Sequence, residues 1–150
     1  MFAFRILLDI ALKALSKAIN DPTTATLAID QLHRLLRCVG NRKLSGETIR
    51  DRNGQLRLIF RTPDWEDYVR LTFTELRFNG AESIQVVRRL RAMIEDLIKT
   101  LPEHRHPALQ KELERLDLTV QRVYAHPDDL ALARIPDSQG LGGSARTKAQ

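Results

Sequence analysis

Apolar residues recur with helical spacing at the start of the chain. Residues 2–19 are rich in Phe, Ile, Leu and Ala, and their charged positions fall four residues apart, at Arg5, Asp9, Lys13 and Lys17. Charges at this spacing drift slowly around a helix as one stripe and leave most of the circumference apolar. We therefore expect a first helix that neighbouring helices largely enclose.

A second helix is predicted to begin at Pro22 and to end at Gly40-Asn41. Asp21 precedes the proline, and an acceptor side chain followed by proline is typical of a helix N-terminus. Gly40-Asn41 is a common stop signal. The apolar positions between these limits are spaced three and four residues apart, at Ala25, Ala28, Ile29, Leu32, Leu35, Leu36 and Val39.

The periodicity changes from helical to alternating between Thr48 and Arg61. Asn53-Gly54 is a strong signal for a tight turn, and apolar and polar positions alternate after it. This pattern predicts one β-hairpin over about residues 47–61. Because a single hairpin is only marginally stable in water, we expect its apolar face to lie on the helices, through Leu56, Leu58 and Phe60.

Three more helical segments follow the hairpin. We expect them from Thr62-Pro63-Asp64 to Asn79-Gly80, from about Glu82 to Leu101, and from about Pro107 to Val123, with a last short turn after Asp128-Asp129. Residues 137–150 are polar and rich in glycine, so a flexible tail is predicted. The fold class is therefore mainly α: a single bundle-like domain of about five helices over residues 1–136, with one hairpin insertion.

Length and composition agree with a folded domain. A chain of 150 residues with 43% apolar and 29% charged residues can bury one real core. The single cysteine, Cys38, excludes a disulfide within the chain, and its place in an apolar series predicts a buried thiol.

The first apolar segment is not expected to cross a membrane. Each of its charges costs about 2.5–3.5 kcal/mol at a bilayer centre. It also lacks the uninterrupted apolar stretch and the small-residue cleavage site of a signal peptide. The chain as given is therefore predicted to be cytoplasmic, either soluble or peripheral to the inner membrane.

The net charge of +5 is unevenly distributed. Residues 1–61 hold 11 Lys/Arg against 5 Asp/Glu, whereas residues 62–136 hold 11 against 13. This asymmetry fits a surface that faces the phosphates of lipid or nucleic acid, and it equally fits scattered solubilising arginines.

Seven arginines are candidate contacts to an anionic surface. We expect them on the hairpin and on the outward side of the fourth helix, at Arg50, Arg52, Arg57, Arg61, Arg88, Arg89 and Arg91. The simpler interpretation is a solvated face on which Arg91 pairs with Glu95 one turn on. Between the binding alternatives, anionic lipid is favoured over nucleic acid, because exposed aromatic residues are not interleaved with these arginines.

The polar corner between the first two helices is a second candidate. It comprises Ser16, Asn20, Asp21, Pro22, Thr23 and Thr24. In a structural role, Asp21 accepts from the amides of Thr23 or Thr24, and Asn20 adopts an unusual backbone angle. In a binding role, the corner would hold a cation or a donor group of a partner, since the Asp21 carboxylate already occupies the position of an anion.

Catalytic patterns are weak throughout. His104 and His106 are two residues apart, which places them on different sides of a helix, and no Cys or carboxylate set completes a metal site. We therefore predict no metal and no cofactor. His33 is interpreted as a residue at the edge of the core. The alternative is a cryptic, hydrolase-like enzyme centred on Asn20, Asp21 and His33.

Several short motifs resemble one protein family. They are Ala11-Leu12-x-Ala14-Leu15-Ser16, Ile19-Asn20-Asp21-Pro22-x-Thr24-Ala25, Pro63-Asp64-Trp65, Gly80-Ala81 and the closing Asp137-Ser138-Gln139-Gly140-Leu141-Gly142-Gly143. Together they resemble a family of bacterial predicted membrane proteins of unknown function. Family members carry several transmembrane helices ahead of this region, and the present chain resembles their soluble portion.

The chain departs from that family pattern in two ways. The transmembrane helices are absent from it, so it is either a short stand-alone relative or a piece of a longer protein. Lys17 stands where the family places a proline after Ser16, so the first helix is expected to run on toward Ile19.

The resemblance and the residues together favour binding over chemistry. We expect a non-catalytic binding or scaffolding module at the membrane, with a membrane surface or a membrane protein as its partner. Self-association is a further alternative, because an apolar first helix can expose a patch that a second copy covers.

Overall fold

The structure, a computed structural model, describes residues 1–44 and 48–139. Its helices are α1 (Phe2–Ala14), α2 (Pro22–Gly40), α3 (Trp65–Asn79), α4 (Ile84–Thr100), the 3₁₀ turn Glu103–Arg105, α5 (His106–Val123) and α6 (Pro127–Ala133). The strands are β1 (Thr48–Arg50) and β2 (Leu56–Ile59). The prediction of a mainly helical fold with one hairpin is thus confirmed, with α6 as a short sixth helix.

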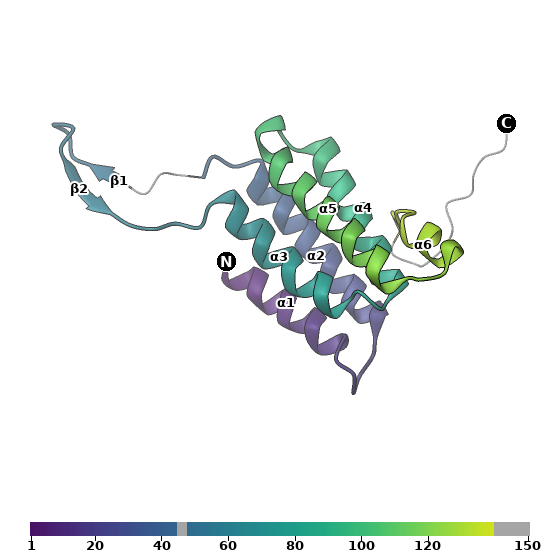
Figure 1. Cartoon of the computed structure of the whole chain (residues 1–150). Coiled ribbons are helices and arrows are strands. Elements are labelled where there is room, and N and C mark those ends of the chain that lie inside the picture. The colour runs from purple at the N-terminus through teal and green to yellow at the C-terminus, as the bar shows by residue number, and fades with distance from the viewer. Residues whose placement is uncertain (45–47, 140–150) are drawn as a thin grey trace.

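Five longer helices form the bundle, and the hairpin projects from one end of it (Figure 1). α2 packs between α1 and α4, while α5 packs against α3 and α4. The apolar faces of these helices meet in one core, whose largest fully buried side chains are Trp65, Phe73, Leu8, Ile29, Leu32, Leu36, Leu76, Leu90, Met93, Ile94, Leu97 and Leu109. The core therefore draws on every long helix.

The ends of α2 and α3 follow the signals in the sequence. Asp21 accepts a hydrogen bond from the Thr24 amide at 3.0 Å and caps α2. Asp64 and Asp67 form a reciprocal capping box at the start of α3. Both helix starts are as predicted. Cys38, however, is exposed near the end of α2, so the expected buried thiol is wrong.

α1 departs from expectation in length and in burial. It ends at Ala14, and the carbonyl of Ser16 then accepts the amides of Ile19 and Asn20 at 3.0 and 2.8 Å. The predicted extension toward Ile19 is therefore wrong. Only one face is enclosed, because α2 and α3 cover one side of the helix, and the apolar side chains on its other side are exposed: Phe2, Ile6 and Ile10.

The segment after α6 is packed on α4 as far as the structure describes it. Asp137 is buried, and its amide donates to the Arg88 carbonyl at 3.1 Å. The predicted flexible tail therefore begins too early, because Asp137 already belongs to the folded domain. The rest of that prediction, residues 140–150, lies outside the described residues, as does residue 47 at the predicted start of the hairpin.

The largest correction concerns the hairpin. Both strands are exposed along their whole length, and Figure 1 shows the pair extending well away from the helices. The expectation that Leu56, Leu58 and Phe60 lie on the helices is wrong. Among the described residues, the hydrophobic core is built by the helices and their flanking segments and includes none of residues 48–61, so the helices pack without the hairpin.

Candidate functional site

The projecting hairpin, residues 48–61, is called the ribbon below. Its turn is built by Asp51, whose carboxylate accepts from the amides of Asn53 and Gln55 at 2.9 and 3.0 Å. Gly54 has a φ of 80°, a left-handed conformation that glycine adopts without strain. The hydrogen bond from Gln55 is the largest cause of the lowered pKa of Asp51. The ionised carboxylate thus organises the tip.

The pairing of the two strands defines two faces. Thr48 lies opposite Ile59 and Ile49 opposite Leu58, and a bulge follows between Ile49 and Arg50. The bulge shifts the register so that Arg50 pairs with Leu56, and this pair lies on the face of Thr48 and Ile59. The face of Ile49 and Leu58 is therefore apolar, and the other face carries Thr48, Arg50, Leu56 and Ile59. Large apolar side chains remain exposed on both: Ile49, Leu56, Leu58, Ile59 and Phe60.

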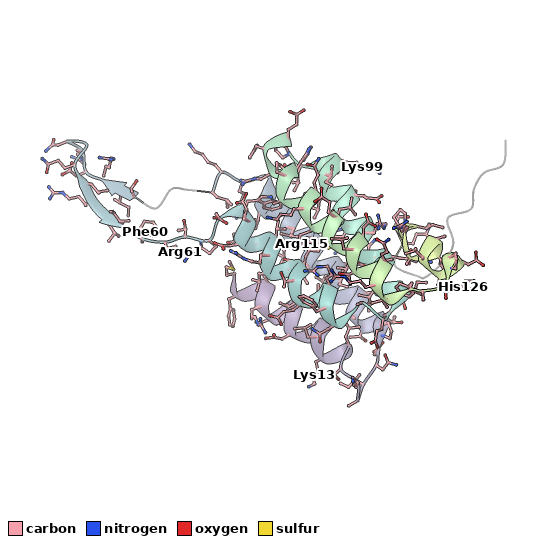
Figure 2. The ribbon with its side chains drawn as sticks, in the orientation of Figure 1. Lys13, Phe60, Arg61, Lys99, Arg115 and His126 are labelled. Carbon is pink, nitrogen blue, oxygen red and sulfur yellow. The ribbon has the colours of Figure 1, made fainter. Side chains whose placement is uncertain are left out.

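The ribbon is also strongly basic. It contains four arginines and one acidic residue, Asp51, which gives a net charge of +3. All four predicted hairpin arginines are exposed. Arg57 pairs with Asp51 at 2.8 Å, and Arg50 donates to the Gly54 carbonyl at 2.9 Å. Figure 2 shows Phe60 and Arg61 on the segment that leads back to α3.

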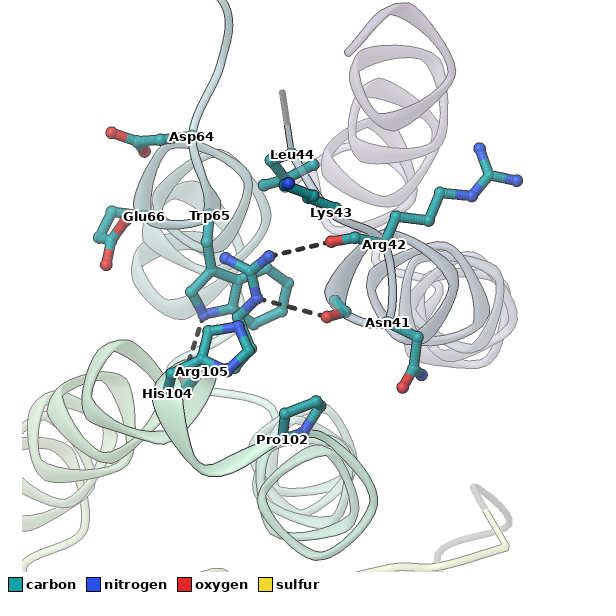
Figure 3. A pocket seen from close by; sticks show the side chains of 11 residues that line it. Asn41, Arg42, Lys43, Leu44, Asp64, Trp65, Glu66, Pro102, His104 and Arg105 are labelled. Carbon is teal, nitrogen blue, oxygen red and sulfur yellow. Dashed lines mark hydrogen bonds between the residues drawn. The ribbon is translucent and has the colours of Figure 1, made fainter. Parts of the chain in front are cut away.

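A cluster at the end of the bundle fixes the root of the ribbon (Figure 3). The Arg105 side chain donates to the carbonyls of Gly40 and Arg42, at 3.3 and 3.1 Å, and so covers the free end of α2. Its guanidinium lies 5.4 Å from the centre of the Trp65 ring. The Trp65 indole in turn donates to the Arg105 carbonyl at 3.0 Å. The end of α2 and the start of α3, which lie before and after the ribbon in the sequence, are therefore tied to the start of α5.

This root also borders an open cavity of about 550 Å³. Lys43 and Leu44 line it from the end of α2, and Glu66 lines it from α3. Sequence reasoning missed the cluster, because Trp65 and Arg105 are 40 residues apart and local spacing does not show contacts at that separation. The buried indole has its hydrogen bond and its cation partner within the protein, which is the chemistry of a structural joint.

The predicted corner has the geometry of a helix cap. Asn20 has a φ of 48°, as the sequence predicted, and Asp21 accepts from both the amide and the hydroxyl of Thr24. The hydroxyl bond is the larger cause of the lowered pKa of Asp21. A cavity of about 520 Å³ beside the corner is lined by Asn20 and Pro22, together with Leu15, Lys17, Asn79, Glu82 and Ser83. A binding role for the corner remains a prediction.

The arginines of α4 are not where the sequence placed them. Arg88, Arg89 and Arg91 are 2%, 8% and 6% exposed, so the expectation that they point outward is wrong. α4 is covered on one side by α2, on another by α5, and on a third by α6 and the segment after it. The triplet therefore has no solvated side.

Each buried arginine has partners inside the domain. Arg88 donates to the Ile135 carbonyl at 3.0 Å. Arg89 pairs with Asp30 of α2 and donates to the carbonyls of Asp137 and Ser138 at 3.1 and 3.0 Å. Arg91 pairs with Asp117 of α5 and lies 3.8 Å from the Glu95 carboxylate, the partner predicted from the sequence. These side chains join helices instead of facing a ligand.

His33 also has a partner that the sequence did not reveal. Its Nε2 lies 2.8 Å from the Asp96 carboxylate on α4, which Arg37 contacts as well. Burial is the largest cause of the lowered pKa of His33; Asp96 raises this pKa, and the charges of Arg37 and Arg89 lower it further. Burial raises the pKa of Asp96, but the bonds from Arg37 and His33 outweigh it and the net pKa is lowered.

The structure does not assemble the suggested hydrolase site. His33 borders a cavity of about 310 Å³ with Asp30, Arg89 and Asp96, whereas Asn20 lines the separate cavity at the other end of α2. The Asp21 carboxylate accepts hydrogen bonds from the amide and the hydroxyl of Thr24. Within residues 1–44 and 48–139, no three His, Cys, Asp or Glu side chains are grouped as metal ligands. The enzyme hypothesis therefore has no geometric support at these residues.

Comparison with known protein families identifies the family of this chain. Residues 1–96, from α1 through most of α4, match the family model described as "Predicted membrane protein (DUF2254)". The chain belongs to this family. The family resemblance seen in the sequence is thus confirmed, and the family description names no activity.

Curated relatives agree with the assignment. The chain is 28% identical over 146 residues to the uncharacterized protein Rv1290c of Mycobacterium tuberculosis H37Rv, and equally to the uncharacterized protein Mb1321c of Mycobacterium bovis. The match covers 97% of this chain and 27% of each relative, so the chain spans about a quarter of their length. No solved structure matches. Among the helices of the described part, none has the length and apolar character needed to cross a bilayer.

Proposed function

We propose that this domain is a non-catalytic binding module of a membrane protein family, and that it attaches to anionic membrane surfaces through the ribbon. The proposal is carried by one observation: a basic, fully exposed hairpin projects from a well-packed helical bundle. The family description supports a location at the membrane.

The charge of the ribbon is suited to lipid phosphates. Four arginines against one aspartate leave a net charge of +3 on a segment of 14 residues. A basic residue near an anionic lipid surface contributes about 1 kcal/mol of binding, and the contribution falls within a Debye length. Because the ribbon extends away from the bundle, its arginines can approach a flat surface without obstruction by the helices.

The place of the ribbon at one end of the bundle gives this attachment a direction. Arg105 and Trp65 join the end of α2 to the start of α3, between which the ribbon is inserted, through three hydrogen bonds. A surface bound to the ribbon would therefore lie beyond the end of the bundle at which α1 begins (Figure 1). A binding module that presents one end to the membrane follows from this arrangement.

Vesicle flotation tests the proposal. The protein is mixed with vesicles of phosphatidylcholine alone or with added phosphatidylserine, at about 0.1 M and about 1 M salt. We expect flotation with the anionic vesicles at the lower salt and a marked loss at the higher salt. The double variant Arg52→Gln with Arg61→Gln removes two charges at about 1 kcal/mol each, so partitioning falls about 30-fold.

A matched control changes the same charge elsewhere. Arg34 and Arg122 are exposed on the bundle and away from the ribbon, and their double glutamine variant keeps the net charge of the ribbon. We expect it to float almost as the wild type does. If both double variants lost flotation equally, the net charge of the protein, and not the ribbon, would explain the binding. Wild-type protein that does not float at low salt would contradict the proposal.

Self-association is a second candidate, favoured by the uncovered side of α1. Phe2, Ile6 and Ile10 are exposed at four-residue spacing and form one apolar stripe. A second copy could cover this stripe. Light scattering of the purified chain tests the idea: we expect a mass of two chains that reverts to one in the variant Ile6→Ser with Ile10→Ser. A single-chain mass for the wild type at all concentrations would reject it.

A further inference from the structure

The charge of the ribbon does not explain why one of its faces exposes apolar side chains. Ile49 and Leu58 are cross-strand neighbours on one face of the ribbon. Their side chains are 48% and 51% exposed. Phe60, two residues after Leu58, is 37% exposed. Arginines suffice to hold a headgroup, so a surface of this kind indicates a partner that is apolar as well as anionic.

We propose that this apolar face enters the interfacial layer of an anionic bilayer while the arginines remain among the phosphates. The inference rests on the proposed function and adds the mode of attachment: Ile49 and Leu58 are the inserting side chains. A bilayer interface offers apolar carbon directly beneath negative charge, and the ribbon offers the complementary pair of surfaces.

The open edges of the ribbon limit the depth of insertion. A two-stranded sheet leaves a row of unpaired backbone N–H and C=O groups along each edge. Such groups are not tolerated in the hydrocarbon region, where no water can satisfy them. The ribbon therefore lies in the layer of headgroups and upper acyl chains, about 5–10 Å deep, as other amphipathic surface elements do.

Charge favours the bilayer over a second copy of the chain. Two ribbons placed face to face would bring two segments of net charge +3 together without added acidic groups, since Asp51 is the one acidic residue of each. Asp51 is moreover engaged at the turn by Arg57 and by two amides. Anionic lipid supplies the missing negative charge.

Depth-dependent fluorescence quenching tests the insertion. Leu58→Trp places an indole on the apolar face, and Thr48→Trp places one on the opposite face of the same ribbon. The native Trp65 is only 2% exposed and gives a background that the wild type measures. Vesicles of phosphatidylserine and phosphatidylcholine carry bromine either high or deep in the acyl chain.

Lipid bromines should quench the indole on the inserted face and should not quench the indole on the other face. We expect a blue shift for Leu58→Trp on vesicle binding, with stronger quenching by the high bromines than by the deep ones. Thr48→Trp should show little quenching. Equal quenching of both positions, or quenching of neither in protein that floats, overturns the insertion and leaves the arginine contact intact. Wild-type protein that does not float overturns both proposals.

Salt resistance gives a second, independent readout. The variant Ile49→Ser with Leu58→Ser keeps every charge of the ribbon, so its low-salt flotation should persist in part. At high salt, where the arginine contribution is screened, its remaining partitioning should fall by at least about 10-fold relative to the wild type. Identical salt curves for variant and wild type would overturn the insertion.

Discussion

Arginines occur in dense groups in two regions of this molecule, and the two groups have opposite environments. On α4, Arg88, Arg89 and Arg91 are buried among carboxylates and carbonyls of three other segments, which are α2, α5 and the segment after α6. On the ribbon, four arginines are exposed along an element that touches solvent on both faces. The same side chain thus joins helices in one region and presents charge in the other.

The comparison shows that burial, and not residue type, decides whether an arginine of this domain joins parts of the fold or stays open to solvent. A guanidinium sequestered from water must keep all its partners, because an uncompensated buried charge is costly. An exposed guanidinium contributes little to folding and is free to contact a partner. Matched substitutions in the two regions should therefore have separable effects.

The largest effect is expected for Arg89→Met. This change leaves Asp30 and the carbonyls of Asp137 and Ser138 without their donor, and breaking such a buried pair costs about 3–5 kcal/mol. Urea unfolding followed by circular dichroism measures the loss. Arg52→Met on the ribbon is the matched control and should change stability by less than about 0.5 kcal/mol. A loss below about 1 kcal/mol for Arg89→Met would contradict the contrast.

A buried leucine of the core and an exposed leucine of the ribbon allow the same comparison between the two regions. Leu97 is fully buried in the core, whereas Leu58 is 51% exposed on the ribbon. Leu97→Ala should destabilise the fold by about 2–5 kcal/mol, because it removes packed methyl groups and leaves a cavity. Leu58→Ala should change the unfolding free energy by less than about 0.5 kcal/mol and reduce vesicle binding instead. A shared loss of stability would mean that the ribbon packs on the bundle.

The corner before α2 is expected to behave as part of the bundle. Asp21→Ala removes the cap on the Thr24 amide and should cost about 0.5–2 kcal/mol of stability. Asp21→Asn restores an acceptor and should recover most of this loss. Chemical denaturation measures both variants, and flotation should be unchanged in each. A loss of vesicle binding without a loss of stability would assign the corner a binding role.

The smallest effect concerns pH. Burial lowers the pKa of His33 below its ordinary value of 6.5, while Asp96 raises it and Arg37 and Arg89 lower it. The unfolded chain then binds the proton more readily, so this stabilisation is present above pH 6.5 and is lost as the pH falls below it. Unfolding free energy should decrease between about pH 7 and 5.5, and less so for His33→Gln.

The same titration separates the two regions. Residues 48–61 contain no histidine. Vesicle binding by the ribbon should therefore stay nearly constant over the pH range in which His33 titrates. Parallel loss of binding and stability would place the attachment on the bundle, beside the cavity that His33 borders.

Local signals in the sequence were sufficient for the helices and turns. Asp21-Pro22, the Asp64 capping box and Asn53-Gly54 act on residues within one turn of themselves, so spacing alone locates them. Long-range contacts were not predictable in this way. The residues around Arg89 do not indicate that Asp30 of another helix is its partner, and the residues around Leu58 do not indicate that the hairpin projects away from the bundle.

The wrong predictions for the burial of α4 and of α1 have one physical origin. A helix that is apolar on one side has the same sequence pattern whether its charged side faces water or packs against further helices. α4 meets α2, α5 and α6, so its arginines are buried; α1 meets two neighbours on one side, so Ile6 and Ile10 are exposed. Only the number of neighbours distinguishes these outcomes.

Replacing residues 48–59 by a short Gly/Ser linker tests most directly that binding and folding reside in different regions. Unfolding free energy and flotation on phosphatidylserine vesicles are measured on the same preparation. We predict an unfolding free energy within about 1 kcal/mol of the wild type, because loop length costs little, together with complete loss of flotation. A bundle that fails to fold, or one that still floats with the anionic vesicles, would contradict this division.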